Sequence, residues 1–227
     1  MTPKPAPTNP ALPAEAQARL QRLLARGRRT LLGLVGPPGA GKSTLAAALC
    51  AASAGAAQVV SMDGFHLANS ELQRLGRRDR KGAPDTFDAA GYAALLRRLR
   101  EQGEAGDATV YAPEYRREIE EAVAGAIGVH AATRLIVTEG NYLLLDQGDW
   151  SGVAALLDEC WYVGGDDTLR VERLTQRHVR FGRTLEHARA WAAGTDEPNA
   201  RLIATTRDRA HWVFRWDGAR SESTAGR

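Results

Sequence analysis

A three-layer α/β/α fold with a mostly parallel central sheet is predicted for this chain of 227 residues. Short apolar runs alternate with helical segments, and the connections are long enough to join one strand to a parallel neighbour. The first run, Leu31–Val35, leads through a glycine-rich loop into the alanine-rich segment Leu45–Ala52. The hydrophobic fraction of 44% suffices for one core, so we expect a single domain over residues 14–217.

The first half of the chain supplies strands and helices on both sides of the glycine-rich loop. Ala16, Leu20 and Leu23 recur at helical spacing, and Gly27 breaks that pattern before the first apolar run. Asp88 is suited to cap a later helix. The expected elements are helix Ala14–Ala25, strand Thr30–Val35, helix Lys42–Ala52, strand Gln58–Met62, helix Ala89–Gln102 and short strand Ala108–Tyr111.

The second half continues this alternation and ends in a group of helices. The expected elements are strands Arg134–Thr138 and Glu159–Val163, helices Asp166–Phe181, Leu185–Ala193 and Asn199–Ala210, and a closing strand His211–Trp216. We assign a helical lid to about residues 166–195. Residues 1–13 and 218–227 are expected to be disordered tails, because they lack apolar periodicity.

Composition and charge exclude several classes of protein. The 30 basic residues are nearly balanced by 27 acidic ones, and the resulting net charge of +3 argues against nucleic acid as a partner. Cys50 and Cys160 show neither metal-site spacing nor a disulfide framework. No apolar stretch reaches the ~18 residues of a membrane span, and the first residues lack the apolar centre of a signal peptide. We therefore expect a cytoplasmic protein without a membrane partner, and homodimerisation is left open.

The segment Gly36–Thr44 matches the phosphate-binding pattern G-x-x-x-x-G-K-S between a strand and a helix. Its glycines allow backbone N–H groups to converge on an anion at the start of a helix. Lys42 can reach the β- and γ-phosphates, and the Ser43 hydroxyl is an oxygen ligand suited to Mg²⁺. The pattern therefore predicts a site for ATP and Mg²⁺. The residues expected to contact the nucleotide are Gly36, Gly39, Ala40, Gly41, Lys42, Ser43 and Thr44.

Two carboxylates follow expected strands and should lie near that loop. In an open parallel sheet, ligands bind beyond the carboxyl ends of the strands, where Asp63 and Glu139 are expected. Asp63 is our candidate for the group that orients an acceptor hydroxyl and accepts its proton, and the alternative is an ordinary Asp-Gly turn. Glu139 is a candidate Mg²⁺ ligand, directly or through water, and the alternative is a carboxylate paired with an arginine.

A row of arginines marks the expected helix over residues 166–181. Arg170, Arg173, Arg177 and Arg180 are spaced so that all four lie on one narrow helical stripe. Such like charges repel one another, so bound phosphate is a natural partner, and Arg183 is a further donor able to close over the nucleotide. A solvated basic face is the alternative.

These motifs together resemble the phosphoribulokinase, uridine kinase and bacterial pantothenate kinase superfamily. The resemblance rests on the P-loop, Met62–His66, Arg80–Asp88, Thr138–Gly140 and the arginine helix, and it extends over about residues 30–214. Within the superfamily, the chain is similar to the nucleoside/nucleotide kinase-like branch that includes candidate fructose kinases of sugar transport systems. The resemblance implies a P-loop kinase fold, with Asp63 as the catalytic carboxylate and Arg177 and Arg180 as lid arginines that contact phosphate.

The acceptor site departs from the pattern of the superfamily. There, a Pro-x-Tyr element is often followed by Asp or Ser, whereas Pro113-Glu114-Tyr115 is followed here by two arginines. Tyr115 and Arg117 are candidate residues of the acceptor pocket. The alternative for Tyr115 is a role in packing without contact to a ligand. His66 could bind the acceptor or a turn carbonyl equally well. The basic segment 77–81 is suited to attract an anionic acceptor, and a solvated loop is the alternative.

The function expected from these observations is transfer of the γ-phosphoryl group of ATP to a hydroxyl of a small metabolite. A sugar such as fructose, a pantothenate-like acid and a nucleoside are all compatible with the motifs. The alternative is a nucleotide-binding regulatory switch with slow hydrolysis. That alternative is disfavoured because the chain lacks an Asn-Lys-x-Asp element and an ABC-type signature, and because a switch would not need Asp63.

Overall fold

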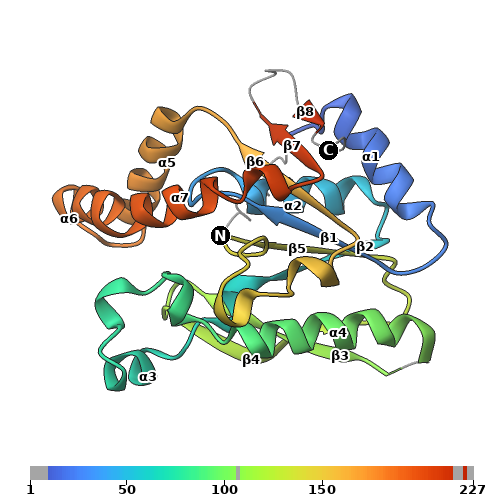
Figure 1. Cartoon of the computed structure of the whole chain (residues 1–227), viewed down its shortest axis with the longest axis horizontal. Helices are drawn as coiled ribbons and strands as arrows, with labels where there is room; N and C mark the ends of the chain where they lie inside the picture. The colour runs from blue at the N-terminus through green and yellow to red at the C-terminus, as the bar shows by residue number, and fades with distance from the viewer. Residues whose placement is uncertain (1–9, 106–107, 217–221, 224–227) are drawn as a thin grey trace, which may run out of the picture.

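The structure, a computed structural model, describes residues 10–105, 108–216 and 222–223. Its centre is a six-stranded sheet (Figure 1) with the order β2 (Ala57–Ser61), β5 (Leu135–Gly140), β1 (Thr30–Val35), β6 (Glu159–Gly164), β7 (Trp212–Arg215) and β8 (Glu222–Ser223). Every neighbouring pair from β2 to β7 is parallel, and β8 pairs with β7 in the antiparallel sense. The predicted mostly parallel sheet is confirmed.

Helices flank this sheet and complete the predicted three layers. They are α1 (Ala14–Leu24), α2 (Lys42–Ala52), α3 (Asn69–Arg74), α4 (Ala89–Ala105), α5 (Asp167–Arg180), α6 (Leu185–Trp191) and α7 (Glu197–Ala204). Figure 1 shows α1 and α2 on one face of the sheet, α4 on the opposite face, and α5, α6 and α7 together beyond one end of it. Residues 1–9, 106–107, 217–221 and 224–227 lie outside the described part, and they include most of both expected tails.

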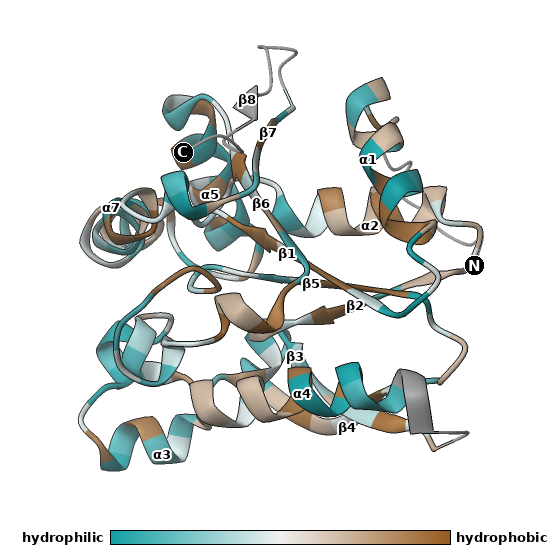
Figure 2. Ribbon diagram, turned by 45° about the vertical axis from the view of Figure 1, so that its right-hand side comes forward, coloured by the Kyte–Doolittle hydropathy of each residue, from teal (hydrophilic) through white to brown (hydrophobic). Residues whose placement is uncertain are grey.

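Each face of the sheet packs into its own apolar cluster. Leu20 of α1 and Leu45 of α2 are fully buried against strand residues such as Leu32. On the other face, Tyr92 of α4 packs with Trp150 at a ring-centroid distance of 6.1 Å. Strands β1 and β5 are buried along their whole length, which agrees with the brown, hydrophobic colour of central strand segments in Figure 2.

A separate hairpin lies below the sheet in Figure 1 and was only partly predicted. Strands β3 (Val110–Arg116) and β4 (Glu121–Val129) pair in the antiparallel sense and form their own two-stranded sheet. The expected short strand at Ala108–Tyr111 therefore begins later and continues to Arg116, and β4 was not predicted. The pairing brings the Pro113–Arg117 segment against the turn that contains Asp63, because the carbonyl of Pro113 contacts Gly64.

The last expected helix is shorter than predicted. Helix α7 ends at Ala204, and a short 3₁₀ turn, Arg207–Arg209, precedes β7. Between α6 and α7 the backbone forms a π-helical segment over Ala192–Asp196. Such segments are rare and frequently lie at functional sites. Among the described residues, no helix has the length and apolar character needed to cross a membrane.

Candidate active site

The glycine-rich loop joins the carboxyl end of β1 to the start of α2. Gly39 and Gly41 have φ angles of 83° and 91°, a backbone conformation that residues other than glycine rarely adopt. A Cβ atom on Gly39 would also lie 2.8 Å from the carbonyl oxygen of Arg170. The first turn of α2 therefore carries unpaired N–H groups toward the loop, as an anion-binding site requires.

Lys42 is buried at the centre of this loop. Its Nζ donates to the carbonyl oxygens of Gly36 and Pro37, at 2.8 and 3.1 Å, and to Asn141 Oδ1 at 2.8 Å. Burial lowers the pKa of Lys42 to about 8, an effect that the nearby carboxylates of Glu139 and Asp63 oppose. All three direct partners are neutral, so the ammonium charge is available to a phosphate group.

Asn141 was not predicted as a functional residue. It follows Glu139-Gly140 at the carboxyl end of β5, and β5 is the neighbour of β1 in the sheet. The rule that strand ends carry function points to the segment that contains Asn141, but only Glu139 was chosen from it as a candidate.

Glu139 lies beside the Ser43 hydroxyl, as expected for a shared metal site. Ser43 Oγ and Ser61 Oγ both donate to Glu139 Oε1, at 3.3 and 2.8 Å. Burial, followed by the charge of Asp63, raises the pKa of the Glu139 carboxyl, so a cation at this position would stabilise the ionised form. Hard oxygen atoms from Ser43 and Glu139, supplemented by phosphate and water, fit Mg²⁺, which uses few protein ligands. Among the described residues, no group of three or more His, Cys, Asp and Glu side chains forms an all-protein metal site.

Asp63 lies on a short 3₁₀ turn, Met62–Phe65, directly after β2. Ser61 Oγ accepts from the Asp63 N–H at 3.1 Å and fixes the start of this turn. The carboxylate reaches the cavity beside the P-loop, and its Oδ2 lies 3.4 Å from Nη2 of Arg117 on the hairpin. Asp63 therefore lines the cavity as well as belonging to a turn.

His66 and Tyr115 form an aromatic surface next to Asp63. His66 Nδ1 lies 2.8 Å from the carbonyl oxygen of Asp63, so the turn carbonyl is one of its partners. Its ring centroid is 4.0 Å from that of Phe87 and 4.6 Å from that of Tyr115. Burial lowers the pKa of His66 and favours its neutral form. Both His66 and Tyr115 line the cavity, as does Arg117.

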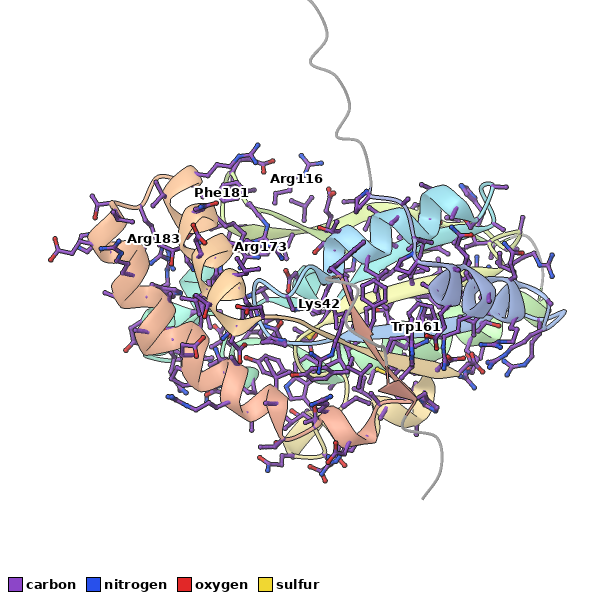
Figure 3. The ribbon with its side chains drawn as sticks, turned by 90° about the horizontal axis from the view of Figure 1, so that it is seen from above. Lys42, Arg116, Trp161, Arg173, Phe181 and Arg183 are labelled. Carbon is purple, nitrogen blue, oxygen red and sulfur yellow. The ribbon has the colours of Figure 1, made fainter. Side chains whose placement is uncertain are left out.

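The arginine stripe of α5 divides into residues with different surroundings. Arg170 is buried, and it pairs with Asp167 at 2.8 Å and with Glu197 of α7, so its partners are internal. Arg173 and Arg177 line the cavity, and in the view of Figure 3 Arg173 projects from α5 toward the region of Lys42. Arg180 is exposed and is not among the cavity-lining residues, so its role as a lid arginine stays a prediction.

Arg183 and several unpredicted residues complete the lid side of the cavity. The guanidinium carbon of Arg183 lies 4.0 Å from the ring centroid of Trp191. His178 Nε2 lies 2.8 Å from Asp196 Oδ2, at the end of the π-helical segment. His178 and Asp196 are far apart in sequence, and the packing of α5 against the π-helical segment brings them together.

One cavity of about 740 Å³ unites most of the predicted residues. The predicted residues that line it are Gly39, Gly41, Lys42, Ser43, Thr44, Asp63, His66, Tyr115, Arg117, Glu139, Arg177 and Arg183. Gly36 and Ala40 belong to the same loop but do not line the cavity. The cavity therefore joins an anion-binding loop, a metal-compatible oxygen pair and a carboxylate within the space of one nucleotide and a small molecule.

Comparisons with known proteins identify kinases among the relatives of this chain. Residues 31–142 match the family model described as an AAA domain. An ATP-dependent kinase-like protein of Aspergillus versicolor is 39% identical over 53% of this chain and 73% of its own. A protein of Schizosaccharomyces pombe, named as a candidate uridine kinase, is 34% identical over 74% of each chain. The crystal structure of a candidate fructose transport system kinase from Silicibacter sp. TM1040 is 37% identical, with a TM-score of 0.79 over 88% of this chain and 98% of that one.

Proposed function

Because this chain belongs to the P-loop kinase superfamily of uridine kinase and bacterial pantothenate kinase and is an ATP-dependent kinase, we propose that it phosphorylates a hydroxyl group of a small metabolite. The observation that carries the proposal is the position of Asp63, which lines the same cavity as Lys42 and Ser43 of the phosphate-binding loop. A nucleotide-binding protein needs the loop alone, whereas a kinase also needs a carboxylate at the acceptor.

The nucleotide half of the cavity binds the triphosphate. Main-chain N–H groups at the start of α2 and the ammonium group of Lys42 hold the phosphate oxygens. Ser43 and Glu139 would hold Mg²⁺, which neutralises phosphate charge when it is bound. Arg173, Arg177 and Arg183 supply further positive charge from the lid side, where charge develops during transfer.

The acceptor half of the cavity supplies the proton acceptor. The hydroxyl oxygen forms a bond to the γ-phosphorus, the bond from that phosphorus to the β–γ bridging oxygen breaks, and ADP leaves with the electron pair. The hydroxyl proton passes to the carboxylate of Asp63. The enzyme contributes mainly position and charge, because phosphoryl transfer needs little covalent chemistry from the protein.

The test is a screen for acceptor-dependent ADP release with Mg²⁺ and ATP. The panel contains fructose and other sugars, nucleosides, pantothenate and small hydroxy acids, and each compound is compared with hydrolysis by the same enzyme in its absence. We expect at least one class to stimulate ADP release and to yield a phosphorylated product by mass spectrometry. Release that no acceptor increases would overturn the proposal and favour the regulatory switch.

A further inference from the structure

The acceptor half of the cavity carries more positive charge than a neutral alcohol requires. Arg78, Lys81 and Arg117 line it beside the aromatic surface of His66 and Tyr115. Lys81 Nζ lies 5.3 Å from the ring centroid of Tyr115, and the Arg117 guanidinium carbon lies 6.0 Å from it. Two cations from different segments thus approach one tyrosine ring at the acceptor position.

The carboxylates of the hairpin neutralise this group of cations only in part. Glu120 also lines the cavity, and it pairs with Arg78 at 3.7 Å. Lys81 donates to neutral oxygens, Asn69 Oδ1 and the carbonyl oxygen of Glu120, and Glu121 accepts from the Asn69 N–H. Burial lowers the pKa of Lys81, and the nearby charges of Glu121 and Glu120 oppose this effect without forming an ion pair with Lys81 among the described residues.

Arg117 has one carboxylate partner among the described residues, and that partner is Asp63. The 3.4 Å contact joins a guanidinium to the carboxylate that must orient the acceptor hydroxyl. An entering alcohol has to compete with Arg117 for Asp63. If the alcohol also carries an anionic group, the Arg117 guanidinium can pair with that group in place of Asp63. The Asp63 carboxylate is then available to the hydroxyl.

The lid adds a second, independent indication of unbalanced charge. Burial, followed by the nearby charge of Arg117, lowers the pKa of Arg177 on α5. Within the part of the chain that the structure describes, Arg177 makes no side-chain hydrogen bond or ion pair. Both guanidinium groups line the cavity that contains Asp63, and their combined positive charge favours an anionic ligand there.

We propose that the acceptor is an alcohol that carries an anionic group, a carboxylate or a phosphate ester, and that Arg117 is the residue that selects it. Arg117 pairs with Asp63 before the acceptor enters and with the anionic group of the acceptor afterwards. Lys81 and Arg78 provide the surrounding positive field. This inference rests on the proposed kinase function and specifies the substrate class.

The experiment compares matched neutral and anionic alcohols as acceptors. The pairs are glycerol with glycerate, pantothenyl alcohol with pantothenate, glucitol with gluconate, and fructose with fructose 6-phosphate. The first three pairs test a carboxylate and the last tests a phosphate ester. We expect kcat/KM to be at least about tenfold higher for the anionic member of the accepted pair.

Variants of two adjacent arginines assign the selectivity. Arg117→Gln should lower kcat/KM for the anionic member by about 10- to 100-fold, mainly through KM, and should therefore reduce or abolish the preference for the anionic over the neutral member. Arg117→Lys should recover part of the loss, because it restores a point charge. The matched control is Arg116→Gln: Arg116 lies on the same hairpin, contacts Glu114 at 3.4 Å and does not line the cavity, so no change is expected.

The outcomes separate this inference from the proposed function. Equal or better use of the neutral members, or an equal loss of both members in Arg117→Gln, would overturn the inference while the kinase activity stands. If no compound is phosphorylated, calorimetry measures the affinity for both members of each pair on protein loaded with Mg²⁺ and a non-hydrolysable ATP analogue. This measurement then tests whether the site prefers an anionic ligand. Anion binding that Arg117→Gln abolishes would support the inference although the proposed function fails, and no preference for the anion would overturn the inference.

Discussion

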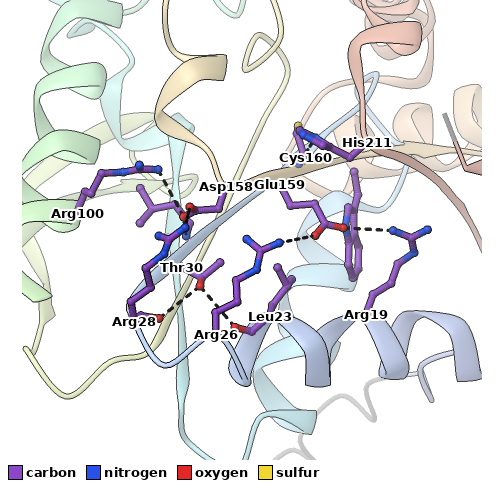
Figure 4. Close-up of polar contacts among 12 residues, drawn as sticks. Arg19, Leu23, Arg26, Arg28, Thr30, Arg100, Asp158, Glu159, Cys160 and His211 are labelled. Atoms are coloured by element: carbon purple, nitrogen blue, oxygen red, sulfur yellow. Dashed lines mark hydrogen bonds and ion pairs between the residues drawn. The ribbon is translucent and has the colours of Figure 1, made fainter. Parts of the chain in front are cut away.

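Charged side chains at the two ends of the central sheet have different partners. At the amino end, Asp158 and Glu159 lie at the start of β6 and are matched by arginines from neighbouring elements (Figure 4). Asp158 Oδ1 lies 2.6 Å from Arg28, and Glu159 lies within 3.4 Å of both Arg19 and Arg26. Each carboxylate at this end therefore has a positive partner.

Arg29 shows how complete the pairing at the amino end is. Its guanidinium donates to Gln102 Oε1 and to the carbonyl oxygens of Leu99, His130, Ala131 and Thr133. These bonds join the start of β1 to α4 and to the loop before β5. The charge is buried, fully hydrogen-bonded and outside the cavity lining, so we assign it to the support of the fold.

At the carboxyl end, the positive groups have few carboxylate partners. Lys42 contacts three neutral oxygens, and neither Arg173 nor Arg177 makes an ion pair within the described ranges. Arg117 pairs with Asp63, the residue that the proposed mechanism requires to be free. Both ends of the sheet contain a buried cation held by neutral oxygens, so burial and partner type do not distinguish Arg29 from Lys42. The comparison teaches that access to the cavity does, because Lys42 lines the cavity and Arg29 does not.

The largest expected effect tests the carboxyl end alone. Asp63→Asn should lower kcat by about 10²–10⁴-fold, because the amide cannot accept the hydroxyl proton, and should leave ATP affinity unchanged. Steady-state ADP release and calorimetry measure the two quantities. The comparison carboxylate is Asp158: Asp158→Asn removes the partner of Arg28 and should lower stability without a similar loss of kcat. Unchanged turnover in Asp63→Asn would remove Asp63 from the mechanism.

Removal of the loop cation should have the next largest effect. Lys42→Ala should lower kcat/KM by about 10²–10³-fold and should also weaken ATP binding, because the ammonium group contacts phosphate before and during transfer. Calorimetric titration with ATP and Mg²⁺ measures the ATP affinity of the variant. Wild-type affinity in this variant would contradict the assignment of Lys42 to the triphosphate.

Replacement of Arg29 tests the opposite end and should affect stability rather than turnover. Arg29→Ala leaves several buried carbonyl oxygens without a donor, and we expect the free energy of unfolding to fall by about 3 kcal/mol. Urea denaturation measures this loss. Arg74→Ala is the control, since Arg74 is an exposed arginine paired with Glu71 on α3, and little change is expected. A stable Arg29→Ala protein would show that the pairing at this end is not structural.

The smallest expected effect concerns the lid. Arg177→Ala should lower kcat by about 10²-fold or less, with a smaller change in KM, because a cation at the transferring phosphoryl acts mainly in the transition state. Arg189→Ala on α6 provides an exposed arginine outside the cavity as a control. A normal kcat for Arg177→Ala would indicate that this part of α5 is a solvated basic face.

Local sequence signals were sufficient for the parallel strands of the sheet and for the phosphate loop. They did not reveal β8, which lies in a segment that was expected to be a disordered tail. Strand Thr30–Val35 and helix Lys42–Ala52 have the predicted bounds, because an uninterrupted apolar run and a glycine-rich loop define them without help from distant residues. Asp63 and Glu139 were found from their positions after strands, since parallel strands end at a common edge.

The remainder depends on contacts between segments that are far apart in sequence. Strand Glu121–Val129 contains three alanines and two glycines, and Pro113 interrupts its partner, so neither strand is evident locally. Arg170 was expected to need an external anion because its partner, Glu197, lies on another helix. Local periodicity cannot show which arginine of a stripe already has a partner.

The placement of Trp216 gives the enzyme a built-in optical probe. Its indole lies against the phosphate-binding loop, since a Cβ atom on Gly41 would lie 2.8 Å from its Nε1, and Trp216 and Trp191 both line the cavity. Trp161 and Trp212 are fully buried in the core instead, with ring centroids 4.7 Å apart. A change in intrinsic fluorescence on nucleotide addition should therefore report on the loop and the lid, with the core tryptophans as a constant background.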